Sequence, residues 1–224
     1  MGKVSVEDPI ATEISADGAY AYVIGRESHK LSIVDITTPS TPTVGGEFDS
    51  ELLDYAWDVK VSACGQYAYC TGAHANSLVI VDVATDPTNP VLVGSVVDYY
   101  SMSYPLGVAT SADSNYVYVV GRTSKALNVV DVGTDPTKPV IVGTVTDSKM
   151  TLPWTVATSA DGQYAYVVSE GSRSFVVIDV TSDPTQPKMV GSLIADSLET
   201  ARFVRVAPAG NVAYVTARNT QALL

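Results

Sequence analysis

The chain has 224 residues, 46% of them hydrophobic, which is enough to bury a sizeable core. Its 24 Asp and Glu residues outnumber 13 Lys and Arg residues, giving a formal net charge of −11 at pH 7. This balance excludes binding to the phosphate backbone of nucleic acid, which needs clustered cations, and argues against attraction to an anionic membrane. No apolar run approaches the ~18 residues of a membrane helix, so we expect no membrane insertion. The N-terminal stretch MGKVSVEDPIATE contains no hydrophobic core of a signal peptide.

Two phrases recur along the chain with a period of about 48 residues. The first has five copies: ISADGAYAYVIG from Ile14, VSACGQYAYCTG from Val61, TSADSNYVYVVG from Thr110, TSADGQYAYVVS from Thr158 and VAPAGNVAYVTA from Val206. The second has four copies: LSIVDITTPSTPTVGG from Leu31, LVIVDVATDPTNPVLVG from Leu78, LNVVDVGTDPTKPVIVG from Leu127 and FVVIDVTSDPTQPKMVG from Phe175. Such a long period indicates a repeat architecture rather than separate domains.

Each repeat predicts four short strands in chain order. Strand A ends just before the Ser-Ala-Asp-Gly turn, for example at residues 57–61, because Asp-Gly is a strong hairpin signal. Strand B is the tyrosine strand, such as 116–120, in which Tyr116 and Tyr118 share one face. Strand C, LVIVDV at 78–83, is apolar throughout and is therefore expected to be covered on both faces. The prolines of Asp-Pro-Thr-x-Pro then force a turn, and strand D follows as VLVGSV.

Four strands per repeat predict an all-β protein, a β-propeller of four-stranded antiparallel blades, since stacked blades bury both faces of each hydrophobic sheet. A β-solenoid is the rival architecture. We expect one domain over residues 1–224, with four full repeats and a partial fifth at 10–56, 57–105, 106–153, 154–201 and 202–224. Residues 222–224 align with the start of a strand C, and residues 2–6 are a candidate closing strand. Either the chain is a fragment of a longer propeller, or a neighbouring molecule completes the last blade.

The literal LVIVD of residues 78–82 resembles the LVIVD-repeat family, and the AYVV and AYVT strands resemble the related YVTN propellers. The resemblance covers the chain from about residue 11 to residue 221. It implies a cell-surface or secreted propeller, with lactonases and dehydrogenase subunits among more distant lookalikes. Its motifs are structural, so the fold is implied more firmly than any activity.

The loops after strands B and D are expected to share one face of a propeller. The B–C loops lean basic and carry Arg26, Arg122, Arg173 and Arg218. The D–A segments diverge most between repeats, and binding residues concentrate in such variable loops. Five residues before each Ser-Ala-Asp-type turn stand Ile10, Trp57, Leu106, Trp154 and Arg202, with Tyr104 nearby. We therefore expect a binding surface at the axial mouth formed by Trp57, Tyr104, Trp154, Arg202, Arg26, Arg122, Arg173 and Arg218. The alternative is that the two tryptophans simply pack between blades.

No catalytic residue, metal ligand or cofactor site is indicated. His29 and His74 lie on equivalent loops of adjacent repeats, but a metal needs more ligands at tighter spacing. The many turn aspartates are expected to hydrogen-bond their own turns rather than to hold Ca²⁺. Cys64 falls at a turn and Cys70 well into the returning strand, so we expect no disulfide between them.

Three functions are compatible with these patterns. The leading hypothesis is a non-enzymatic scaffold that binds an unknown protein or small ligand. The first alternative is a structural subunit that self-associates by completing blades or by stacking oppositely charged faces. The second is a lactonase-like or hydrolase-like enzyme, which rests on the distant resemblance alone.

Overall fold

The computed structural model describes residues 2–210, 212–218 and 222–223, which form five antiparallel sheets. In chain order the strands are β1 (Pro9–Ile14), β2 (Tyr20–Gly25), β3 (Lys30–Asp35), β4 (Thr43–Asp49), β5 (Ala56–Val61), β6 (Tyr67–Gly72), β7 (Ser77–Asp82), β8 (Val91–Val97), β9 (Pro105–Thr110), β10 (Tyr116–Gly121), β11 (Ala126–Asp131), β12 (Val140–Thr146), β13 (Pro153–Thr158), β14 (Tyr164–Ser169), β15 (Ser174–Asp179), β16 (Lys188–Ile194), β17 (Ala201–Val206), β18 (Ala213–Ala217) and β19 (Ala222–Leu223). Two short 3₁₀ turns, η1 (Glu51–Leu53) and η2 (Asp196–Leu198), precede β5 and β17.

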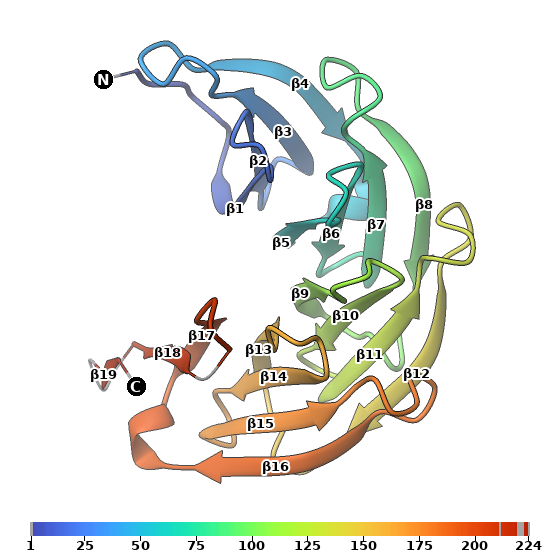
Figure 1. The fold of residues 1–224 in the computed structure, drawn as a ribbon, viewed down its shortest axis with the longest axis vertical. Coiled ribbons are helices and arrows are strands. Elements are labelled where there is room, and N and C mark those ends of the chain that lie inside the picture. The colour runs from blue at the N-terminus through green and yellow to red at the C-terminus, as the bar shows by residue number, and fades with distance from the viewer. Residues whose placement is uncertain (1, 211, 219–221, 224) are drawn as a thin grey trace.

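Each sheet is a meander whose strands pair in sequence order, four in the first four sheets and three in the fifth. The inner strands β1, β5, β9, β13 and β17 pack side by side in that order, and the sheets fan outward from them as blades. Figure 1 shows the blades following an arc, with β1 and β17 on the two sides of its opening. The predicted strands A to D and the start of a third strand in the fifth blade are thereby confirmed.

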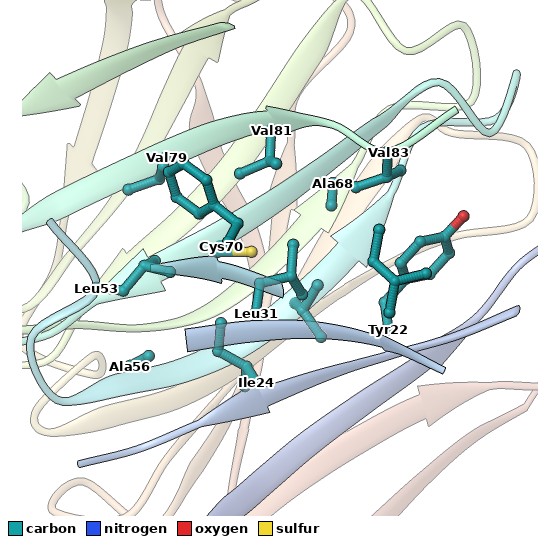
Figure 2. Packing of buried hydrophobic residues seen from close by; sticks show 13 residues of the cluster. Tyr22, Ile24, Leu31, Leu53, Ala56, Ala68, Cys70, Val79, Val81 and Val83 are labelled. Carbon is teal, nitrogen blue, oxygen red and sulfur yellow. The ribbon is translucent and has the colours of Figure 1, made fainter. Parts of the chain in front are cut away.

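The core lies between blades. Between the first two blades, Tyr22, Ile24 and Leu31 pack against Cys70 and Val79, as Figure 2 shows. The third strand of a blade is covered on both faces, as β7 of the second blade shows: its residues 78–81 are 0% exposed. Because alternate residues of one strand face opposite neighbouring blades, the uninterrupted LVIV run is required by the packing.

The glycine that ends the second recurring phrase has a packing reason in the first three blades. A Cβ on Gly94 in β8 would lie 2.3 Å from the carbonyl oxygen of Pro136, so only glycine lets the outer strand approach the proline turn of the next blade. Gly2 lies against Pro42 and Ser40 in the corresponding way. Residues 2–6, the candidate closing strand, form no strand here and run beside the first blade rather than joining the fifth.

One repeated set of hydrogen bonds holds the hairpin between the first two strands of the first, third and fourth blades. Ser15 donates to the Asp17 carboxylate at 2.6 Å and accepts from the Tyr20 backbone N–H at 2.9 Å. The same bonds recur at Ser111 and Ser159. The aspartates thus serve turn geometry, as expected. Neither cysteine forms a disulfide: Cys64 is exposed in its turn and Cys70 is buried in β6.

Candidate functional site at the axial mouth

The first residues of the inner strands meet at the loop end of the axis. Trp57 is the second residue of β5 and Trp154 the second residue of β13. Although they belong to the second and fourth blades, their ring centroids lie 5.2 Å apart. Leu106, in the intervening β9, packs with Ala73 beneath them. Side-by-side packing of the inner strands therefore brings together tryptophans separated by almost 100 positions in the sequence.

Three further rings extend this surface. Tyr55 stacks on the His74 imidazole with centroids 4.3 Å apart and lies 6.1 Å from the Trp57 ring. Tyr104 contacts both, at 6.2 Å from Tyr55 and 5.7 Å from His74. Trp154 is only 7% exposed, whereas Trp57, Tyr55 and Tyr104 are half-buried and His74 is exposed. The result is an aromatic surface with a buried base and an accessible outer layer.

Tyr55 and Tyr104 occupy a backbone position that repeats in every blade. Each precedes an inner strand with a left-handed φ, 54° for Tyr55 and 55° for Tyr104. Positive φ is unusual for a bulky residue and often marks a functional site. Here, however, Asp8, Leu152 and Thr200 adopt the same conformation at the equivalent positions. The strained backbone therefore belongs to the repeat, and only the choice of tyrosine is particular to this surface.

Two arginines and one glutamate surround Trp154. The guanidinium carbons of Arg122 and Arg202 each lie 4.3 Å from the centre of its ring, a distance suited to cation–π attraction. Glu170 accepts a hydrogen bond from the Trp154 indole N–H at 2.5 Å and forms ion pairs with Arg122 at 3.0 Å and Arg202 at 3.8 Å. Burial disfavours the charged carboxylate, but these hydrogen bonds and cations outweigh it and lower the pKa of Glu170. Two guanidinium groups thus share one ionised carboxylate.

Arg26 completes the arrangement on the first blade. Its guanidinium lies 5.4 Å from the Tyr55 ring centre and 3.8 Å from carboxylate oxygens of Asp8 and Glu27. The Nε atoms of Arg26 and Arg202 are buried and have no hydrogen-bond partner in the described part of the chain. We call Tyr55, Trp57, His74, Tyr104, Trp154, Arg26, Arg122, Arg202 and Glu170 the mouth cluster.

Six of the eight residues predicted for the binding surface lie in the mouth cluster, and two lie outside it. Arg173 forms an ion pair with Asp196 at 2.8 Å, and its side chain is half exposed. Arg218 is exposed after β18, and its backbone N–H donates to the Thr200 carbonyl. Among the described residues, neither arginine makes a ring contact with the mouth cluster.

Sequence reasoning missed Tyr55, His74 and Glu170 as members of the site. Glu170 directly follows β14, in the position that Arg26 and Arg122 take after their own strands. An acid at a position filled by arginine in the first, third and fifth blades was a usable signal, because adjacent blades place equivalent loop residues side by side. Tyr55 likewise aligns with Tyr104, directly before an inner strand.

The two histidines share one acidic neighbour. The Asp54 carboxylate lies 3.2 Å from Nε2 of His29 and 3.6 Å from Nδ1 of His74, so the two imidazoles converge on one acid. Within residues 2–210, 212–218 and 222–223, no group of three or more His, Cys, Asp or Glu side chains is arranged to hold a metal ion. The same residues include no helix with the length and apolar character needed to cross a bilayer.

The fold and its repeated blades define the class of protein as an all-β repeat protein of the β-propeller type. The LVIVD repeat family matches residues 10–50, 54–98, 110–147 and 155–194, which lie in the first four blades. These matches cover most of the chain, and the protein therefore belongs to the LVIVD repeat family. A search of curated proteins finds no matching sequence.

Solved structures share the architecture at low sequence identity. A functionally unknown protein from Desulfotomaculum acetoxidans DSM 771 is 14% identical with a TM-score of 0.81, over 100% of this chain and 71% of its own. Hydrazine synthase from Kuenenia stuttgartiensis is 22% identical, TM-score 0.73, over 96% of this chain and 56% of its own. A periplasmic gluconolactonase from Pseudomonas aeruginosa is 16% identical, TM-score 0.79, over 98% of this chain and 66% of its own. At these identities the likeness concerns the fold alone.

Proposed function

We propose that this chain is a non-enzymatic interaction scaffold whose mouth cluster binds a segment of a partner protein. The observation that carries the proposal is a continuous surface of five aromatic rings from three blades, flanked by three arginines. Trp, Tyr and Arg dominate binding energy at protein interfaces because they bury large areas at little entropic cost. The inner strands hold Trp57, Trp154 and Arg202 in place before binding.

The charge of the mouth cluster favours an acidic partner segment. Around Trp154, Arg122 and Arg202 form ion pairs with a single acid of the described residues, Glu170, which leaves one positive charge in excess there on a chain whose net charge is −11. A carboxylate of the partner would approach these guanidinium groups as an apolar side chain covers Trp57 and Tyr104. A location at the cell surface or outside the cell, implied by the family resemblance, is part of this proposal. Lactonase-like or hydrolase-like activity is the less favoured alternative, since similarity to a gluconolactonase at 16% identity supports the fold only.

Selection of random peptides displayed on phage against the whole chain tests the proposal. We expect enrichment of peptides that combine Asp or Glu with an aromatic or large aliphatic residue. Replacing Trp57, W57A, should weaken their binding roughly tenfold or more, as expected for an interface anchor. Y100A is the matched control, because Tyr100 is 90% exposed and lies outside the mouth cluster. Failure to enrich any peptide, or equal binding by W57A and the wild type, would contradict the proposal.

Self-association is a second candidate function, favoured by the exposed face of the fifth blade. Tyr22, Tyr69 and Tyr118 face the following blade and are 2%, 1% and 1% exposed. The equivalent Tyr214 is 47% exposed, and Phe203 beside it is 52% exposed. Exposed apolar faces of this kind invite association. Light scattering across protein concentration tests this candidate: a mass that rises with concentration and returns to that of a monomer in Y214S supports it, and a strict monomer rejects it.

A further inference from the structure

A polar cavity lies in the axial channel, one layer inward from the mouth cluster. Its volume is about 220 Å³, and its walls come from all five inner strands. The residues two positions before each A–B turn supply one layer of the wall: Glu13, Lys60, Ala109, Ala157 and Arg205. A second cavity of about 330 Å³ shares Thr110, Thr158 and Val206 with it and reaches the A–B turns. The axial cavity is thus approached from the turn face, opposite the mouth cluster.

Most charges in this channel are already neutralised. Lys60 is 14% exposed and forms an ion pair with Glu13 at 2.5 Å. The Asp58 carboxylate accepts backbone N–H groups of Val59 at 2.9 Å and Val108 at 3.1 Å, so both of its oxygens are bonded. Burial raises the pKa of Asp58, and the nearby Lys60 charge and Val108 hydrogen bond offset part of that effect. These three side chains therefore hold the inner strands together and offer little to a ligand.

Arg205 is different. Among the described residues it forms no ion pair, and the one hydrogen bond of its guanidinium is a long one, 3.4 Å, to the Val204 carbonyl. An arginine has five N–H donors arranged as a planar fork that fits a carboxylate with two parallel hydrogen bonds. The hydroxyls of Thr110 and Thr158 line the same cavity, and no hydrogen bond of either is formed within the described part of the chain. The charge of Arg205 acts on the nearby Asp58 carboxylate without forming an ion pair with it, so most N–H donors of the guanidinium stay available beside these two hydroxyls.

We propose that the axial cavity binds a small aliphatic carboxylate, with Arg205 holding the carboxylate group and Thr110 and Thr158 contacting its polar substituents. Apart from the Glu13–Lys60 ion pair, the remaining walls are apolar, formed by Ala109, Val156, Ala157 and Val206, and suit a short hydrocarbon chain. A volume of about 220 Å³ corresponds to roughly seven water molecules at ~30 Å³ each, room for an acid of six to ten heavy atoms. This site is separate from the mouth cluster and does not depend on the function proposed for it.

Ligand-observed NMR titration of the whole chain with butyrate, lactate and inorganic phosphate tests the proposal at constant ionic strength. We expect saturable binding of butyrate or lactate with a Kd on the order of 1 mM, and weaker binding of phosphate. R205Q should weaken carboxylate binding at least about tenfold, because it removes the charged fork. R173Q makes the same change of charge at an arginine outside the channel and should bind like the wild type.

A second variant keeps the proposal testable if R205Q fails to fold. T158V keeps the shape of the side chain, removes its hydroxyl and should weaken lactate more than butyrate, which lacks a hydroxyl. Equal carboxylate binding by R205Q and the wild type would overturn the proposal, as would no saturable binding of either acid. Phosphate bound more tightly than both acids would overturn the assignment to carboxylates. W57A should leave carboxylate binding unchanged, so this proposal and the proposed peptide binding fail independently.

Discussion

The two ends of the inner strands use the same repeat in opposite ways. At the turn end, Ser15, Ser111 and Ser159 form nearly identical bonds to their aspartates, at 2.6, 2.6 and 2.5 Å. At the loop end, the second residue of the inner strand differs from blade to blade: it is Ile10, Trp57, Leu106, Trp154 or Arg202. The residues next to this position also differ between blades. Regularity at the turn end secures the blades, and variation at the loop end creates a surface that no single blade contains. The difference teaches where to look for function in a repeat protein.

The largest effect expected at the loop end comes from Trp154. W154A should destabilise the protein by roughly 3–5 kcal/mol, because it empties a buried site and leaves the Glu170 carboxylate without its indole donor. W57A should cost much less, since Trp57 is half-buried. Urea unfolding of both variants measures the difference. Equal losses in the free energy of unfolding would mean that both tryptophans are core residues. The distinction between a buried base and an accessible outer layer would then be wrong.

A smaller and more uniform effect is expected at the turn end. S111A and S159A should each cost about 1 kcal/mol, because each removes one bond to an aspartate and one to a tyrosine N–H. The fifth blade carries Ala207 and Ala209 at the equivalent positions. The double variant A207S/A209D should therefore gain stability by up to about 1 kcal/mol. Unfolding measurements that found very different costs at Ser111 and Ser159 would contradict the equivalence of these turns.

The smallest effects are protonation differences between the turn end and the channel. The hydrogen bond from Ser111 lowers the pKa of Asp113 below its ordinary value of 3.8, whereas burial raises the pKa of Asp58 above it. Ionised Asp113 therefore stabilises the fold above pH 3.8, and this contribution is lost as pH falls through its lower folded pKa. Ionised Asp58 costs stability at neutral pH, and that cost is relieved as pH falls through its raised pKa.

Carboxyl-carbon NMR titration of the folded protein resolves these two groups. We expect the Asp113 midpoint below 3.8 and the Asp58 midpoint above it, with S111A moving the Asp113 midpoint upward. A midpoint for Asp58 below that of Asp113 would reverse the assignment. T110A, which changes a channel hydroxyl outside the Ser111 turn, is the control and should leave Asp113 unmoved.

The sequence by itself determined the strands, their order and the turns between them, because these depend on local chemistry. Val and Tyr alternate on two covered faces, proline ends a strand, and Asp with Ser closes a hairpin, all within about ten residues of each other. It also marked Trp57, Trp154 and Arg202 as equivalent positions, and the structure brings these three together.

Only the tertiary structure decided which of the equivalent side chains touch. The pairing of Glu170 with Arg122 and Arg202, the stacking of Tyr55 on His74, and the absence of Arg173 and Arg218 from the mouth cluster depend on how adjacent blades pack. The same holds for Arg205, which forms no ion pair among the described residues, whereas Lys60 pairs with Glu13 of the neighbouring blade. Contacts of this kind join residues 19 to 48 positions apart, and no local periodicity records the direction in which their side chains point.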